Sequence, residues 1–177
     1  MLKIRENIPI APLTTFRIGG NAKYFTEIEN IKDLVVAIKW ANDIQISYLL
    51  LAGGSNVLIS DGVINALVIK ISDRSYIFNG ELVRVSAGFI LSELIDKASE
   101  SGWGGLEKLY GIPGTIGGAV RGNAGAFDLE IKDFVASVSA CNLVTGQVKT
   151  FNNAECSFTY RGVILNQILN GILQKWN

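Results

Sequence analysis

The chain has 177 residues, of which 49% are hydrophobic, so it is long enough for one substantial core or for two small lobes, and disorder is excluded. Sixteen lysine and arginine residues balance sixteen aspartate and glutamate residues, so no net charge attracts nucleic acid or an anionic membrane. Histidine is absent, which excludes Ser-His and Cys-His nucleophilic catalysis and most zinc sites. We expect a small-molecule partner and a cofactor that supplies the chemistry.

The N-terminal residues intersperse Lys3, Arg5 and Glu6 with short apolar pieces and contain no hydrophobic run of signal-peptide length. The most apolar stretch, residues 48–52, is far shorter than the roughly 20 residues that a membrane helix needs. These features predict a soluble cytoplasmic protein.

The first part of the chain alternates strands with a helix. Residues 23–29 read as a strand, and Asn30 is placed to cap a helix whose apolar positions recur at helical spacing up to residue 41. The continuous apolar run 46–52 predicts a strand buried on both faces, and 57–60 and 66–71 predict two further short strands. The pattern is that of a β-α-β unit.

The pattern changes after residue 75. Residues 75–87 predict a hairpin with a two-residue turn at Asn79 and Gly80, residue types that accept positive backbone dihedrals. A helix is predicted over residues 91–101, with Gly102 at the position of a left-handed C-terminal cap.

A glycine-rich loop is predicted over residues 102–125, followed by a second hairpin around residues 145–146. The composition changes near Asp73, so a break between two lobes is placed between residues 70 and 76. A mixed α+β architecture fits these elements best.

The first glycine loop, residues 52–58, lies between two predicted strands and contains no lysine or arginine. If it holds a phosphate, backbone N–H groups must do so, because the loop has no cationic side chain. Gly53 and Gly54 permit the close approach that this needs, and Ser55 and Asn56 could add side-chain donors. The alternative is an ordinary tight turn.

The second glycine segment, residues 111–126, is unusually rich in glycine for a simple connection. Such density is entropically unfavourable, so the segment is predicted either to contact a flat ligand or to pack tightly within the protein. Neither segment ends in Gly-Lys-Ser/Thr, which excludes a Walker loop. The first loop also lacks the third glycine and the following helix of a Rossmann fingerprint.

The two cysteines, Cys141 and Cys156, are too few and too far apart in sequence for a disulfide framework or a close pair of metal ligands. Buried free thiols are the prediction, and no metal site is expected.

Four motifs occur in the order seen in the UDP-N-acetylenolpyruvoylglucosamine reductases, which the chain resembles over residues 1 to about 161. They are Thr-Thr-Phe-Arg-Ile-Gly-Gly at 14–20, Ala-Gly-Gly-Ser-Asn-Val-Leu at 52–58, Gly-Leu-Glu at 105–107 with the segment 111–127, and Cys-Ser-Phe-Thr-Tyr-Arg at 156–161.

The resemblance implies a two-lobed FAD-binding fold of the vanillyl-alcohol-oxidase type, with lobes at 1–72 and 73–161 and tightly but non-covalently bound FAD. The loop at 53–56 would hold the FAD pyrophosphate, and Thr115 would lie near the isoalloxazine. The cofactor-binding residues implied are Gly53, Gly54, Ser55, Asn56, Gly111, Pro113, Gly114, Thr115, Gly117, Gly118, Asn123, Ala124 and Gly125.

The resemblance also implies a reaction. In this family NADPH reduces FAD, which then reduces UDP-GlcNAc-enolpyruvate to UDP-N-acetylmuramate for peptidoglycan synthesis. Arg161 matches the catalytic arginine that polarises the substrate carboxylate, a task that suits the bidentate guanidinium. Without the resemblance, Arg161 would be an ordinary surface arginine.

Residues 162–177 do not match the family, so we expect a chain that lacks the C-terminal substrate lobe and its proton-donating serine. Ser157 is expected to be a strand hydroxyl and not a substitute donor. Val163, Ile164, Ile168 and Ile172 recur roughly at helical spacing, so this tail is expected to cover apolar surface.

Three functions therefore remain open from the sequence. The chain is an FAD-dependent reductase, impaired by truncation, or it is a non-catalytic FAD-binding module. The third is another flavin oxidoreductase, in which histidine or cysteine would attach the flavin covalently. There is no histidine, and neither cysteine lies in a glycine segment.

Overall fold

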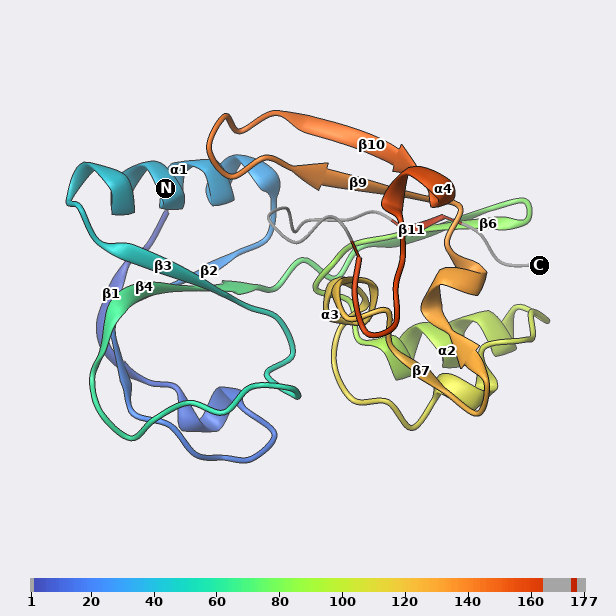
Figure 1. Cartoon of the computed structure of the whole chain (residues 1–177), viewed down its shortest axis with the longest axis horizontal. Helices are drawn as coiled ribbons and strands as arrows, with labels where there is room; N and C mark the ends of the chain where they lie inside the picture. Colours follow the sequence, from blue (N-terminus) through green and yellow to red (C-terminus); the bar gives the residue numbers. More distant parts are fainter. Residues whose placement is uncertain (1, 164–172, 175–177) are drawn as a thin grey trace. The chain divides into compact units, whose positions relative to one another are not determined.

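The computed structural model describes residues 2–163 and 173–174. It divides into two compact units, Met1–Asp73 and Arg74–Asn177 (Figure 1). The interpretation of residues 1–72 and 73–161 as two FAD-binding lobes, with a separate tail at 162–177, stays a prediction.

The first unit is a four-stranded sheet with one long helix. The strand order is β1-β2-β4-β3, in which β1 is antiparallel to β2, while β2 and β3 each run parallel to β4. Its elements are β1 (Arg5–Pro9), η1 (Ala11–Leu13), β2 (Asn21–Ile28), α1 (Ile31–Asp43), β3 (Ser47–Leu51) and β4 (Ile64–Ile71).

Helix α1 begins where the sequence predicted. The Asn30 side chain accepts a hydrogen bond from the Asp33 backbone N–H at 2.9 Å, which satisfies one donor of the first turn. The helix lies across one face of the sheet (Figure 1). Its buried positions recur at helical spacing: Leu34, Ala37, Ile38 and Ala41.

The predicted strand at 57–60 is wrong. This segment is irregular in the structure, and Leu58 is 79% exposed. The Ser60 carbonyl accepts from the Gly20 N–H at 2.7 Å, so it bonds to a loop and not to a strand. A short apolar run becomes a strand only when a neighbouring strand offers its backbone groups.

The second unit contains a five-stranded sheet with the order β10-β9-β11-β6-β5. Its strands are β5 (Tyr76–Asn79), β6 (Leu82–Val85), β9 (Ser137–Cys141), β10 (Val148–Asn152) and β11 (Leu173–Gln174). A small hairpin joins β7 (Gly125–Ala126) to β8 (Leu129–Glu130). The helical elements are α2 (Leu91–Glu100), η2 (Glu107–Leu109), α3 (Ile116–Arg121), η3 (Ile131–Phe134) and α4 (Asn153–Cys156).

Both predicted hairpins form, but the turn of the first lies one residue later than expected. Asn79 pairs with Leu82, so the loop is Gly80 with Glu81, and Gly80 has a φ of +59°. This register places Phe78 opposite the buried Val83. The apolar pairing therefore fixes the register, and a glycine at the first loop position suits a type II′ turn.

The prediction of a continuous loop over residues 102–125 is also wrong, because this stretch contains α3. The Thr115 hydroxyl caps the helix by accepting from the Gly118 N–H at 3.4 Å. Glycine has a low helix propensity, so burial of Ile116 and Val120 stabilises a helix that local preference does not indicate.

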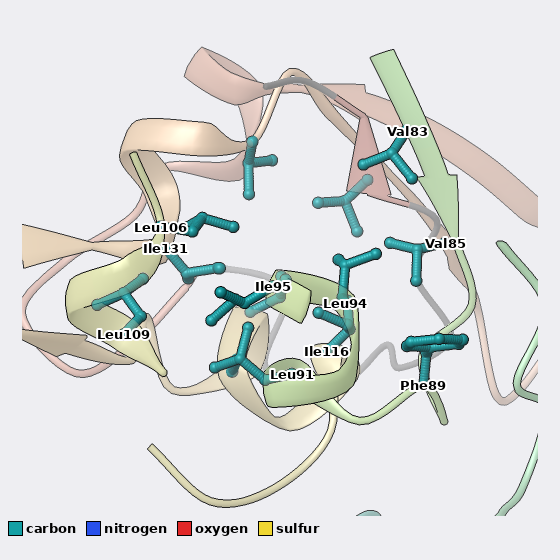
Figure 2. Packing of buried hydrophobic residues seen from close by; sticks show 14 of the residues in the cluster. Val83, Val85, Phe89, Leu91, Leu94, Ile95, Leu106, Leu109, Ile116 and Ile131 are labelled. Atoms are coloured by element: carbon teal, nitrogen blue, oxygen red, sulfur yellow. The ribbon is translucent and has the colours of Figure 1, made fainter. Parts of the chain in front are cut away.

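The core of the second unit gathers side chains from β6, α2, α3 and the segments between them (Figure 2). The labelled members are Val83, Val85, Phe89, Leu91, Leu94, Ile95, Leu106, Leu109, Ile116 and Ile131. Val163 joins this core and is 3% exposed. The predicted helical spacing of the tail falls on residues 164–172, which lie outside the described residues.

Candidate cofactor site

In the first unit, the loop 52–58 lies against the segment 14–20, so two of the four motifs contact each other. The Thr15 N–H donates to the Gly54 carbonyl at 3.0 Å. Gly54 has a φ of +68°, and a Cβ there would lie 2.1 Å from the Leu13 carbonyl oxygen. Glycine at this position is thus required by the protein's own backbone.

The segment 14–20 is held by its own hydrogen bonds. The buried Thr14 hydroxyl lies 3.1 Å from the carbonyl oxygens of both Ala11 and Ile18. At Gly20, a Cβ would lie 1.8 Å from the Gly62 carbonyl oxygen. The sequence marked these residues only as part of a motif, and their role as a support for the glycine loop comes from the structure.

The first glycine loop offers polar groups at its surface. Gly53 and Ser55 are half-buried, and Asn56 is exposed. The Lys70 ammonium, from β4, donates to the Ala52 carbonyl at 3.2 Å. The Lys70 ammonium therefore lies beside a loop that contains no lysine or arginine. Because Lys70 is 18 positions from Ala52 in the chain, the loop motif did not indicate it.

In the second unit, α3 begins against the segment 87–91, which sequence reasoning missed. The Ile116 and Gly117 N–H groups donate to the carbonyls of Phe89 and Ala87, each at 2.8 Å. A Cβ at Gly117 would lie 2.7 Å from the Ala87 Cβ, so the second glycine segment packs tightly here. Gly117, which the resemblance places at the cofactor, is therefore buried and used for packing, and ligand contact is left to the accessible residues of the segment.

Several predicted residues of this segment remain accessible. Gly111, Pro113 and Gly118 are exposed, whereas Gly114, Ala124 and Gly125 are half-buried and Thr115 is buried. Gly114 has a φ of +121°, which strongly favours glycine. The backbone around α3 is thus available for contact with a flat ligand.

Asn123 is fully buried, and both ends of its side-chain amide are used by the protein. The Nδ2 group donates to the Thr159 carbonyl at 2.9 Å, and Oδ1 accepts from the Lys132 N–H at 3.3 Å. The prediction that Asn123 lines the cofactor can therefore be met only through its backbone.

Arg161 lies in a tight turn beside the second glycine segment. Thr159 and Gly162 exchange N–H to carbonyl hydrogen bonds at 2.9 and 3.2 Å, and Arg161 has an unusual φ of +56°. Its Nη1 donates to the Gly125 carbonyl at 3.2 Å, and its guanidinium lies 5.5 Å from the centre of the Tyr160 ring. The third and fourth motifs are thus in contact, and the exposed guanidinium can still receive an anion.

A carboxylate stands close to this arginine. The hydrogen bond from Lys132 lowers the pKa of Glu130, with further lowering by Asn123 and Arg161, so Glu130 is ionised at neutral pH. The same hydrogen bond raises the pKa of Lys132. Sequence reasoning did not single out Glu130, because its nearness to Arg161 depends on the β7–β8 hairpin.

Ser157 is not the strand hydroxyl that was expected. It follows α4 in a left-handed conformation with a φ of +45°, and its Oγ donates to the Ala154 carbonyl at 3.4 Å. A hydroxyl engaged in ending a helix is poorly suited to donate a proton to substrate.

Both cysteines are buried free thiols, as predicted. Burial raises the pKa of each, and that of Cys156 rises to about 11. Within residues 2–163 and 173–174, no group of three His, Cys, Asp or Glu side chains could hold a metal ion. In the same part of the chain, no helix has the length and apolar character needed to cross a membrane.

The Cys156 thiol is expected to make stability fall at high pH. Its folded pKa of about 11 exceeds the ordinary value of 9.0, so the folded state retains the proton longer than the unfolded state. The contribution is complete below about pH 9 and is lost as pH rises towards about 11. Urea unfolding at a series of pH values should show this loss in the wild type and a smaller slope in Cys156→Ala. Equal slopes would contradict the prediction.

Comparison with known proteins identifies the domain. The sequence profile of the FAD binding domain matches residues 22–152. The chain belongs to this family. The match includes both glycine segments, together with the strands from β3 to β10 and nearly all of β2.

The predicted resemblance to the reductases is also confirmed. The chain is 38% identical over 167 residues to the UDP-N-acetylenolpyruvoylglucosamine reductase of Caldicellulosiruptor bescii, covering 94% of this chain and 53% of that protein. The crystal structure of the corresponding reductase from Thermus caldophilus superposes with a TM-score of 0.82 at 28% identity, covering 100% of this chain and 64% of that chain. The chain spans about half the length of the curated relatives that it matches.

The fold class predicted from the sequence is confirmed as well. A vanillyl-alcohol-oxidase-type flavoprotein from Myceliophthora thermophila superposes with a TM-score of 0.64 at 15% identity, covering 89% of this chain and 32% of that one. At this level of identity the likeness establishes the α+β fold and nothing of the substrate.

Proposed function

We propose that the chain contributes the FAD-binding part of an NADPH-dependent reductase that converts UDP-GlcNAc-enolpyruvate to UDP-N-acetylmuramate in peptidoglycan precursor synthesis. The observation that carries this proposal is the similarity to curated reductases of that name, which extends over 94% of the chain in the example from Caldicellulosiruptor bescii. The reaction uses a nucleotide sugar and NADPH, so we place it in the cytoplasm, without nucleic-acid or membrane partners.

The residues of the two glycine segments fit a flavin dinucleotide. Gly53, Ser55 and Asn56 present backbone and side-chain donors at the surface of a loop that Gly54 anchors to the protein. Backbone N–H groups together with the nearby Lys70 ammonium suit an anionic pyrophosphate. Gly111, Pro113 and Gly118 are exposed and carry no long side chain, so their backbone suits contact with a planar ring. We propose non-covalent binding.

The redox chemistry would come from the flavin, which can accept a hydride from NADPH and pass it to a carbon-carbon double bond. Arg161 would bind the substrate carboxylate through paired N–H donors and stabilise negative charge beside it. Its hydrogen bond to the Gly125 carbonyl and the nearby Glu130 carboxylate support its orientation.

FAD binding is the first test of this proposal. Purified chain titrated with FAD is expected to quench flavin fluorescence saturably and to unfold at a higher temperature, because ligand that binds only the folded state stabilises it. The covalent alternative is tested on the same sample, since denaturation should release all of the flavin. No change in fluorescence or melting temperature would reject the flavoprotein assignment.

Turnover then separates the two remaining functions. FAD-loaded chain that oxidises NADPH only when UDP-GlcNAc-enolpyruvate is present would support the reductase. Flavin bound without turnover would favour the non-catalytic FAD-binding module for this length of chain.

A further inference from the structure

The Asn123 side chain is buried and held by hydrogen bonds at both ends of its amide. It is 0% exposed, and a buried amide is unfavourable unless its donor and acceptor are both satisfied. Both are satisfied by backbone groups, the Thr159 carbonyl and the Lys132 N–H. The amide therefore fixes these two backbone positions relative to each other.

One of those positions controls Arg161. The Thr159 carbonyl belongs to the first residue of the turn 159–162, which is closed by two hydrogen bonds between Thr159 and Gly162. Arg161 lies inside that turn, in a left-handed conformation that a non-glycine residue seldom adopts. A displacement of the Thr159 carbonyl would thus displace the backbone from which the guanidinium extends.

The guanidinium is attached to the same stretch of chain. Arg161 Nη1 donates to the carbonyl of Gly125, two residues after Asn123, and Gly125 pairs with Glu130 across the β7–β8 hairpin. The ionised Glu130 carboxylate adds an electrostatic attraction for the arginine. Both the turn and its charged side chain are therefore held by residues of the second glycine segment.

We propose that Asn123 is a positioning residue, whose buried amide holds the turn 159–162, and with it the Arg161 guanidinium, against the second glycine segment. This inference rests on the proposed function, because it assigns Asn123 to carboxylate binding by Arg161. It also separates Asn123 from its cofactor-lining neighbours, since the amide is already bonded to the protein.

The test uses Asn123→Asp, which keeps the shape of the side chain, its acceptor for the Lys132 N–H and its tolerance of the observed φ of +39°. The variant removes the donor to the Thr159 carbonyl, and at about pH 8.5 an ionised carboxylate faces that carbonyl and the Glu130 carboxylate instead. Asn153→Asp is the matched control. Asn153 Nδ2 likewise donates to backbone carbonyls, those of Lys132 and Val135, but not to the turn 159–162.

The first measurement needs no ligand. Trypsin cleavage of the full chain after Arg161 is expected to be about tenfold faster in Asn123→Asp than in the wild type, because loss of this hydrogen bond frees the turn, and tenfold corresponds to about 1.4 kcal/mol. Cleavage after Lys39, in α1 of the first unit, should be unchanged, and so should every rate in Asn153→Asp. If Asn123→Asp accelerates all sites by unfolding, Asn123→Ser is measured in its place. An unchanged rate after Arg161 in a folded variant overturns the proposal.

The second measurement separates positioning from cofactor binding. In FAD-loaded chain, Asn123→Asp is expected to bind UDP-GlcNAc-enolpyruvate about tenfold more weakly, as followed by flavin absorbance, with FAD affinity within about twofold of wild type. Weaker FAD binding together with unchanged cleavage after Arg161 would overturn the proposal in favour of a cofactor role. If the wild type binds no FAD, the proposed function fails, and the trypsin measurement still decides whether Asn123 holds the turn.

Discussion

Replacement of Gly54 by alanine is expected to lower the free energy of unfolding by about 3 kcal/mol or more. A φ of +68° costs an alanine about 1–2 kcal/mol, and the added Cβ would lie 2.1 Å from the Leu13 carbonyl oxygen. Overpacking of this kind typically adds about 1–3 kcal/mol. Urea unfolding followed by circular dichroism measures the change.

Gly62→Ala is the matched control for this variant. Gly62 belongs to the same connection between β3 and β4, and a Cβ there meets no atom within 4 Å. Its stability is expected to stay within about 0.5 kcal/mol of the wild type. Equal effects of the two substitutions would show that the close approach of Gly54 to the segment 14–20 contributes nothing to stability.

Replacement of Arg161 by alanine is expected to weaken the binding of UDP-GlcNAc-enolpyruvate to the FAD-loaded chain by about 10- to 100-fold. A hydrogen bond to a charged group contributes about 1.5–3 kcal/mol, and the guanidinium is an exposed cation beside the second glycine segment. FAD affinity should change little, because Arg161 is not among the proposed cofactor-binding residues. Titration of substrate into FAD-loaded protein, followed by flavin absorbance, gives both the affinity and the control.

Arg74→Ala controls for the loss of a positive charge. Arg74 lies in the same unit, where it forms an exposed ion pair with Glu93 at 3.4 Å. Substrate affinity in this variant should match the wild type, since an exposed ion pair contributes about 1 kcal/mol at most and this arginine has no proposed ligand. Loss of affinity in both variants would indicate a general electrostatic effect and would remove the specific role of Arg161.

Sequence patterns predicted elements whose causes are local. The cap at Asn30, the left-handed Gly102 with a φ of +78°, and the hairpin around Thr145 and Gly146 all occur as expected. In each case, the preference of one or two residues agrees with the apolar periodicity around them. Elements that depend on distant partners were predicted less well, as α3 and the segment 57–60 show.

The candidate site likewise has features that the sequence indicated and features that only the structure showed. Its residue types and motif order, in both glycine segments and around Arg161, were readable because glycine density and a motif are properties of consecutive residues. The contact of Gly54 with Leu13, the approach of Lys70 to Ala52 and the proximity of Glu130 to Arg161 were not. Each joins residues whose separation in the chain carries no local signal.

The sequence by itself determined the class of this protein: an α+β chain of the FAD-binding domain family, with backbone-rich segments suited to a dinucleotide. Only the tertiary structure decided what individual polar residues do. It showed that the Asn123 amide bonds to the Thr159 carbonyl and the Lys132 N–H. It also showed that position 54 must be glycine, because a Cβ there would collide with the Leu13 carbonyl oxygen. The physical reason is that hydrogen bonding and steric exclusion act over a few ångströms, and the fold alone determines which groups come that close.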